Sequence, residues 1–152
     1  MTSLKAGVIG LGNMGGGVAR NLAAAGYETG VWDVSKEAIM KFRNIENTYV
    51  LSPGEMAAQG ATLFYVVPAT REIEETLEGE QGVLAQAAEG TVVFDLTTSF
   101  PEDTKRVVEL ADKHGVKYLD AAMSGGATGA DSGSLTLMIG GDKNVYESSR
   151  TM

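Results

Sequence analysis

The sequence has no cysteine among its 152 residues. This excludes disulfides, thiol chemistry and zinc sites with cysteine ligands. It also has no apolar run as long as a membrane span. Its first residues lead directly into a strand-like segment, without the apolar region of a signal peptide. We therefore expect a soluble, cytoplasmic protein that does not bind membranes.

Positive charge is also scarce. The chain has 12 lysines and arginines against 20 aspartates and glutamates, so its formal net charge is −8. Nucleic-acid binding depends mainly on basic contacts to phosphate, and this composition disfavours it. Small anionic ligands remain possible partners, because backbone N–H groups can bind them without charged side chains.

The length fits one domain over residues 1–152, and a hydrophobic content of 43% is sufficient for a packed core. Strand-like segments alternate with helical patterns along the whole chain, which predicts βαβ units and a mostly parallel sheet. The expected strands cover residues 4–10, 29–33, 48–51, 62–67, 91–96, 117–120 and 135–139. The expected helices cover residues 13–25, 35–42, 70–77 and 82–88, with others beginning near residues 53, 101 and 142.

Several local signals place helix ends. Ser52 and Glu55, with Pro53 between them, fit a capping box at a helix start. Ser35 is a suitable N-cap for the helix over 35–42. In the helix that begins at Pro101, the spacing predicts an inward face of three residues, namely Val107, Leu110 and Ala111.

A glycine-rich turn lies between the first strand and the first helix. Residues 10–15, Gly-Leu-Gly-Asn-Met-Gly, fit the pattern G-x-G-x-x-G. In that pattern the first glycine allows a tight turn, the second lets a pyrophosphate approach the backbone, and the third lets the helix pack closely on the strand. The N–H groups at the helix N-terminus then face the phosphates. The expected cofactor-binding residues here are Gly10, Leu11, Gly12, Asn13, Met14 and Gly15.

An acidic residue completes this pattern when it ends the second strand about 20 residues further on, where it binds the adenosine ribose. Asp33 stands at that place. The alternative is that the glycines are ordinary turn residues and Asp33 is a loop carboxylate. The order of strand, turn, helix, strand and acid favours a Rossmann-type, doubly wound α/β domain. Asp33 would repel the 2′-phosphate of NADP and Val34 follows it, although Lys36 is near, so we expect NAD rather than NADP.

The run from Val8 to Gly15, which ends in Met14-Gly15, resembles the opening signature of the 3-hydroxyisobutyrate dehydrogenase, or β-hydroxyacid dehydrogenase, family. Three later segments resemble family motifs in the same order, namely Val67-Pro68, residues 95–98 and residues 120–126. The resemblance then continues to residues 140–141. Ala122, Met123 and Thr97 depart from the family pattern, and these departures leave the substrate open.

The resemblance implies an oxidoreductase that transfers hydride between NAD(P) and a small 3-hydroxy acid or short aldehydo-acid. It places Val67, Pro68 and Thr98 near the cofactor. It implies that the substrate carboxylate binds to Ser124, Gly125 and Gly126, since glycine N–H groups and a serine hydroxyl can form an anion-binding hollow. The alternatives are that Thr98 caps a turn and that the glycines only join two elements.

In the resembled family the general acid–base is a lysine on a helix that follows the Rossmann domain, and a helical domain lies beyond it. The resemblance places both beyond Met152, the last residue of this sequence. Lys143 is its last lysine and lacks the family's lysine motif. We therefore expect no catalytic residue within this chain, no turnover by the chain alone, and a homo-oligomer in the full-length form.

Some alternatives of function stay open at this point. Imine, glyoxylate-type and 6-phosphogluconate-type enzymes share the same N-terminal pattern. A non-enzymatic NAD-binding module is a further alternative, because the glycine-rich motif specifies binding only.

Other polar residues have simpler explanations. Asp95 and Asp120 end strands without an obvious partner for acid–base work, which favours local capping. His114 lies near a helix C-terminus, where a charge–dipole contact and exposure to solvent explain it. The glutamates between residues 72 and 80 fit a solvated helix face better than a metal site. We therefore expect no metal.

Overall fold

The structure, a computed structural model, describes residues 3–150. Its strands form one sheet in the order β3-β2-β1-β4-β5-β6-β7, parallel except for the antiparallel pairing of β7 with β6. The strands are β1 (Ala6–Ile9), β2 (Thr29–Trp32), β3 (Thr48–Val50), β4 (Thr62–Tyr65), β5 (Val92–Asp95), β6 (Lys117–Ser124) and β7 (Thr136–Gly140). This is the doubly wound α/β sheet that the sequence predicts.

Met152 lies outside the described residues. The expectation that the family's catalytic lysine and helical domain come after Met152 therefore concerns a part of the protein that the structure does not describe. It stays a prediction.

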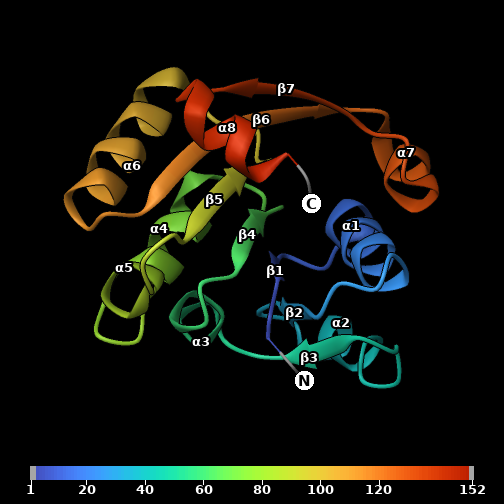
Figure 1. The fold of residues 1–152 in the computed structure, drawn as a ribbon. Helices are drawn as coiled ribbons and strands as arrows, with labels where there is room; N and C mark the ends of the chain where they lie inside the picture. The colour runs from blue at the N-terminus through green and yellow to red at the C-terminus, as the bar shows by residue number, and fades with distance from the viewer. Residues whose placement is uncertain (1–2, 151–152) are drawn as a thin grey trace.

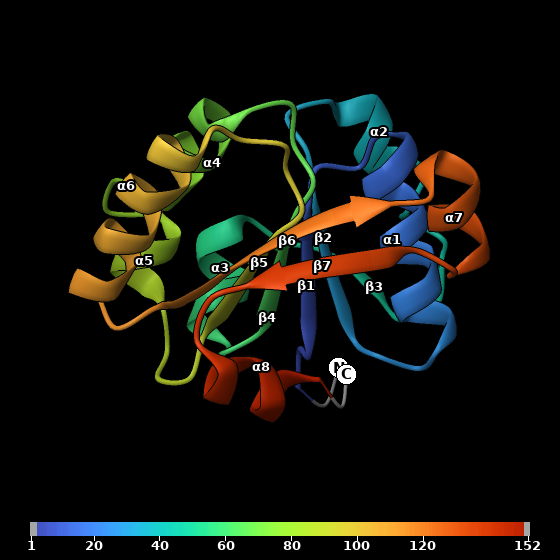
Figure 2. The same cartoon turned by 90° about the horizontal axis from the view of Figure 1, so that it is seen from above.

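Helices cover both faces of the sheet (Figures 1 and 2). One group comprises α1 (Asn13–Ala24), α2 (Lys36–Met40) and α7 (Gly126–Ser132). The other comprises α3 (Pro53–Ala58), α4 (Thr70–Leu77), α5 (Val83–Gln86) and α6 (Pro101–Lys113). The last helix, α8 (Lys143–Ser149), packs Val145 and Tyr146 onto β5 and β6, on the α1 side. No helix within residues 3–150 is long and apolar enough to cross a membrane.

The strand order reverses between β1 and β4, because the chain runs from β1 outward to β3 and then returns to the other side of β1. In open α/β sheets, ligands bind at such a switch point, outside the carboxyl ends of the strands. Every residue of β1 is buried, as expected for a central parallel strand covered on both faces. The glycine-rich turn therefore follows directly from a buried strand at the centre of the sheet.

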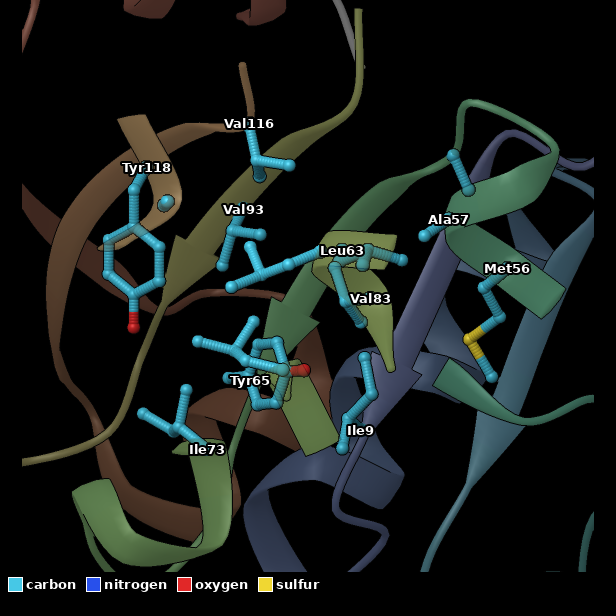
Figure 3. Packing of buried hydrophobic residues seen from close by; sticks show 14 of the residues in the cluster. Ile9, Met56, Ala57, Leu63, Tyr65, Ile73, Val83, Val93, Val116 and Tyr118 are labelled. Atoms are coloured by element: carbon cyan, nitrogen blue, oxygen red, sulfur yellow. The ribbon is translucent and has the colours of Figure 1, made fainter. Parts of the chain in front are cut away.

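The larger core cluster lies between the sheet and helices α3 to α6, where Ile9, Leu63, Tyr65 and Val93 meet (Figure 3). At its edge, Met56 of α3 packs where two neighbouring strands carry glycine. A Cβ on Gly7 would lie 2.6 Å from the Met56 sulfur, and one on Gly30 would lie 2.9 Å from Met56 Cγ. The thioether therefore fills the space that two missing side chains leave.

On the other face, α7 lies directly against α1. A Cβ on Gly17 would come within 2.7 Å of the Ala130 backbone, so only glycine permits this approach. The Asn21 side-chain amide donates to the carbonyls of Gly17, Ala130 and Asp131 at 3.0, 2.7 and 3.2 Å. Arg20 adds an exposed ion pair with Asp131 at 2.6 Å. These contacts fix α7 beside the helix that follows the glycine-rich turn.

Many element predictions are confirmed. Helix α4 has the predicted bounds, and Ser52 and Glu55 form the predicted capping box. Ser35 caps α2, although that helix ends at Met40 rather than at residue 42. In α6, Val107 and Ala111 are buried as predicted. In α1 the buried side is made of small residues, because the helix lies so close to the sheet and to α7.

Two predictions near the end of the described chain are wrong or incomplete. β6 does not end at Asp120 but continues to Ser124, because β7 returns antiparallel and pairs with its last five residues. Helix α7 occupies a segment in which the sequence pattern predicts no helix. It consists largely of glycine, alanine and small polar residues without an apolar period, and its contacts with α1 stabilise it instead.

Candidate functional site

An open cleft of about 1170 Å³ lies over the switch point, at the carboxyl ends of the parallel strands. Nine of the thirteen predicted site residues line it: Gly10, Gly12, Asn13, Met14, Gly15, Asp33, Val67, Pro68 and Thr98. Leu11 does not, because its side chain is buried in the core cluster of α1 and α2. Ser124, Gly125 and Gly126 also lie outside the lining, although the adjacent Met123 belongs to it.

The three glycines of the turn differ in what the fold requires of them. Gly10 has φ +98°, and a Cβ there would lie 2.1 Å from the Val66 carbonyl oxygen. A Cβ on Gly15 would lie 1.8 Å from the Gly10 carbonyl oxygen. Both positions therefore need glycine for folding alone.

Gly12 is different, because nothing in the protein lies within 4 Å of where its Cβ would be. Its backbone angles, φ −66° and ψ −164°, are open to any residue. Packing and conformation therefore give no reason for glycine here. The space beside it opens into the cleft, at the N-terminus of α1, where backbone N–H groups favour phosphate oxygens.

Asp33, directly after β2, sits beside the glycine-rich turn. Its Oδ2 accepts the Leu11 backbone N–H at 2.7 Å, and its Oδ1 accepts the Ser35 N–H at 2.8 Å. These bonds hold the carboxylate at the cleft while leaving lone pairs on both oxygens. Such a held, partly exposed carboxylate can accept hydrogen bonds from vicinal ribose hydroxyls.

The next two strands supply the middle of the cleft. Val67 and Pro68 follow β4, and Thr97 and Thr98 follow β5. The Thr97 hydroxyl accepts the Val67 N–H at 3.4 Å, which joins the two strand ends. Thr98 is exposed to the cleft, whereas Thr97 is only 4% exposed.

Asp95 is buried at the end of β5, where it accepts the Thr97 N–H at 2.9 Å and the Tyr118 hydroxyl at 2.8 Å. Burial raises its pKa, and these hydrogen bonds oppose the rise. The predicted local capping is confirmed at Thr97, but the sequence gives no sign of the Tyr118 partner. His114 is exposed as predicted, with Nδ1 3.0 Å from the Leu110 carbonyl oxygen.

The opposite wall of the cleft, which α3, α4 and the α4–α5 loop build, is not predicted by the sequence motifs. Four glutamates line it, namely Glu72, Glu75, Glu78 and Glu80. The last three are exposed, as predicted for a solvated face, but the face borders the cleft. The remaining glutamate of the run, Glu74, instead pairs with Arg106 of α6 at 2.8 Å.

The cleft lining contains five carboxylates, counting Asp33, and no lysine, arginine or histidine of the described chain. Glu72 has an oxygen, Oε2, that is buried without a hydrogen-bond partner. Within residues 3–150, no group of three or more acidic or histidine side chains is placed to hold a metal ion. The cleft therefore offers backbone amides for phosphate and acidic side chains for hydroxyl or amino donors.

A sequence profile of the NAD-binding domain of 6-phosphogluconate dehydrogenase matches residues 5–152. The chain belongs to this family. Curated relatives include the probable mitochondrial 3-hydroxyisobutyrate dehydrogenase of Dictyostelium discoideum, 33% identical over 150 residues, or 99% of this chain and 47% of that one. The NAD-dependent L-serine dehydrogenase of Pseudomonas aeruginosa is 35% identical over 145 residues, or 95% of this chain and 48% of that one.

Solved structures of related proteins have the same fold as this chain. The Mycobacterium tuberculosis 3-hydroxyisobutyrate dehydrogenase with L-serine has a TM-score of 0.86 at 28% identity, covering 99% of this chain and 50% of that one. These comparisons confirm the resemblance to 3-hydroxyisobutyrate dehydrogenases, an oxidoreductase family. This chain spans about half the length of the relatives it matches. The L-serine dehydrogenase is NAD-dependent, and a further similar structure is a complex with NADP+.

Proposed function

We propose that this chain binds NAD at the cleft over β1 and β4, as the cofactor-binding part of a hydroxyacid dehydrogenase. The open space at Gly12 carries the proposal, because the fold needs glycine at Gly10 and Gly15 but not at Gly12. A ligand that closely approaches the backbone at Gly12 would explain why this position carries no side chain. A pyrophosphate on the N-terminal N–H groups of α1 is such a ligand.

Asp33 supports NAD as the preferred cofactor. Its carboxylate is held by two backbone amides and so cannot easily swing away from a 2′-phosphate. The glutamates of the opposite wall add negative charge, and no cation of the described chain lines the cleft to offset it. Lys36, the nearest cation along the sequence, is an exposed first residue of α2 and is not part of the lining.

For the complete enzyme we propose reversible hydride transfer between NAD and a small hydroxy acid, as the names of the relatives suggest. The cofactor supplies the hydride chemistry, and the chain binds and orients it. Thr98 and Met123 lie at the end of the cleft nearest β6, where a substrate would meet the nicotinamide. Ser124, Gly125 and Gly126, which follow Met123, remain our candidates for holding its carboxylate. The proton-transferring lysine would come from beyond Met152.

The proposal is tested by calorimetric titration of NAD into the Gly12→Ala variant. We expect Kd to rise about tenfold or more, because the methyl group occupies the space that the pyrophosphate needs. Gly140→Ala in β7 is the matched control, since a Cβ there also meets nothing within 4 Å and lies outside the cleft. Equal NAD affinity in both variants, or no binding by the parent chain, would contradict the proposal.

A further inference from the structure

A line of hydrogen bonds runs from the interior of the sheet to the cleft wall. The Tyr118 hydroxyl of β6 donates to Asp95 Oδ2 at 2.8 Å. Asp95 Oδ1 accepts the Thr97 N–H at 2.9 Å, and the Thr97 hydroxyl also bonds to this carboxylate. That hydroxyl in turn accepts the Val67 N–H. The line thus connects three neighbouring strands, β6, β5 and β4.

Only one end of this line belongs to the cofactor cleft. Val67 and Thr97 line the cleft, whereas Asp95 and Tyr118 do not. Asp95 is 1% exposed and Tyr118 is 6% exposed. Tyr118 lies in the same core cluster as Tyr65 (Figure 3). A contact with cofactor therefore cannot explain the buried carboxylate or the tyrosine.

The buried carboxylate also has no cation beside it in the described chain. Tyr118 and Asp120 of β6 and Tyr65 of β4 are the titratable groups that interact with it. On the helices over this face, Glu74 and Arg106 pair with each other and stay partly exposed. Hydrogen bonds alone hold the charge, so each donor matters for the position of the carboxylate and of whatever it binds.

We propose that Tyr118 is a positioning residue for cofactor binding: through Asp95 it fixes the Thr97–Thr98 turn against Val67 and so sets the wall beside which the nicotinamide half lies. The inference rests on the proposed function. Nothing in it requires Tyr118 or Asp95 to touch the cofactor.

Loss of the Tyr118 hydroxyl has a consequence that ordinary destabilisation lacks. Burial already raises the pKa of Asp95, and the bond from Tyr118 opposes that rise. In Tyr118→Phe the pKa of Asp95 therefore rises further, and the carboxyl group takes up a proton closer to neutral pH. A protonated Asp95 binds the Thr97 N–H less strongly, because the bond is no longer charge-assisted. The turn then loosens as pH falls.

The test compares Tyr118→Phe with Tyr49→Phe in the 152-residue chain. Tyr49 also bonds through its hydroxyl to a carboxylate, that of Glu28, but at the β3 edge of the sheet and outside the cleft. We expect Tyr118→Phe to raise the Kd for NAD at neutral pH by roughly three- to tenfold, the range for one lost hydrogen bond. Its Kd should rise further as pH is lowered, whereas the parent and Tyr49→Phe should give flatter profiles.

A second variant isolates the titration of Asp95. In Tyr118→Phe with Asp95→Asn, the amide oxygen still accepts the Thr97 N–H but has no proton to gain. Its Kd should therefore be independent of pH over the range in which Tyr118→Phe alone changes. A pH-dependent double variant, or a Tyr118→Phe profile that matches Tyr49→Phe, would overturn the inference while leaving NAD binding itself intact.

Amide hydrogen exchange in the unliganded chain gives a readout that needs no cofactor. We expect Tyr118→Phe to speed exchange at the amides of Thr97 and Val67, which the line of bonds protects, more than at Val66, whose N–H bonds to Ile9. Uniformly faster exchange along β4 and β5 would show a purely structural role and refute the inference. Absence of NAD binding by the parent chain would instead refute the proposed function.

Discussion

The Leu11 backbone N–H donates a 2.7 Å hydrogen bond to the Asp33 carboxylate, so the position of this carboxylate depends on the conformation of the glycine-rich turn. We expect Asp33→Asn to shift the affinity ratio of NADP to NAD toward NADP by about tenfold, because removing the charge relieves repulsion of the 2′-phosphate. Titration of both cofactors at fixed ionic strength measures this ratio. Asp112→Asn, which removes an exposed charge outside the cleft lining, is the control and should leave it unchanged.

The acidic wall predicts an unusual dependence on salt. Anion sites built from lysine and arginine weaken as salt screens their attraction. Here five carboxylates and no cation of the described chain line the cleft, so screening should strengthen the binding of the more highly charged NADP. Calorimetric Kd values across ionic strength measure the slope, and Glu75→Gln with Glu78→Gln should flatten it. NADP binding that weakens with salt in the parent chain would contradict this picture.

Asn21 should matter for stability rather than for NAD binding. Its amide donates to three carbonyls at the junction of α1 and α7, and its removal leaves them without these donors. We expect Asn21→Ala to lower the free energy of unfolding by about 1–3 kcal/mol, measured by urea denaturation. The exposed Asn144→Ala in α8 is the control. Loss of NAD affinity in proportion to stability would show that α7 also shapes the cleft.

The outline of the candidate site could be predicted from sequence because it is local. Gly10, Gly12 and Gly15 lie in one turn between a strand and a helix, and Asp33 follows at the end of the next strand. Periodicity and turn chemistry report such short-range features directly. The motif already gives Gly12 a different task from Gly10 and Gly15, but only the structure shows that a Cβ at Gly12 would meet no other atom of the protein.

The features that sequence reasoning missed depend on contacts between distant segments. Helix α7 is stabilised by its close packing on Gly17 and by hydrogen bonds from Asn21, and both residues lie more than a hundred positions earlier in the chain. Glu72 and Glu75 of α4 look like part of a solvated face from their pattern alone, since only the sheet topology brings them to the cleft that Asp33 also lines. The bond from Tyr118 to Asp95 likewise joins neighbouring strands that a helix separates in sequence.

We expect the 152-residue chain to bind NAD without oxidising hydroxy acids. Hydride transfer from a hydroxy acid to NAD is accompanied by loss of the hydroxyl proton, and a side chain that takes this proton typically contributes about 10² to 10⁴-fold to the rate. No lysine or histidine lines the cleft within residues 3–150. Lys143 lines a separate cavity of about 340 Å³ beside Tyr146. An assay with L-serine, 3-hydroxyisobutyrate and other small hydroxy acids measures turnover; robust activity would place a proton-transfer group within the chain rather than beyond Met152.

The edge strand β7 predicts self-association. Leu137 and Met138 are 38% and 57% exposed on a strand that has a partner on only one side within the described sheet. Unpaired edges with exposed apolar side chains favour pairing between chains. We expect apparent mass in size-exclusion chromatography with light scattering to rise with concentration. Met138→Lys should reduce this rise, whereas Met40→Lys, on the distant α2, should not. Association that is indifferent to Met138 would assign it to another surface.

Because the Met56 side chain packs against both Gly7 and Gly30, the residues at these three positions constrain one another during evolution. A Cβ at either glycine would lie less than 3 Å from the methionine side chain. A smaller residue in place of Met56 would leave a cavity over the two glycines. Each single change is therefore unfavourable, although a larger residue in a strand combined with a smaller one in α3 restores the volume. Neutral drift through this part of the fold has to proceed by paired substitutions, which makes the three positions a place where related sequences should vary together or not at all.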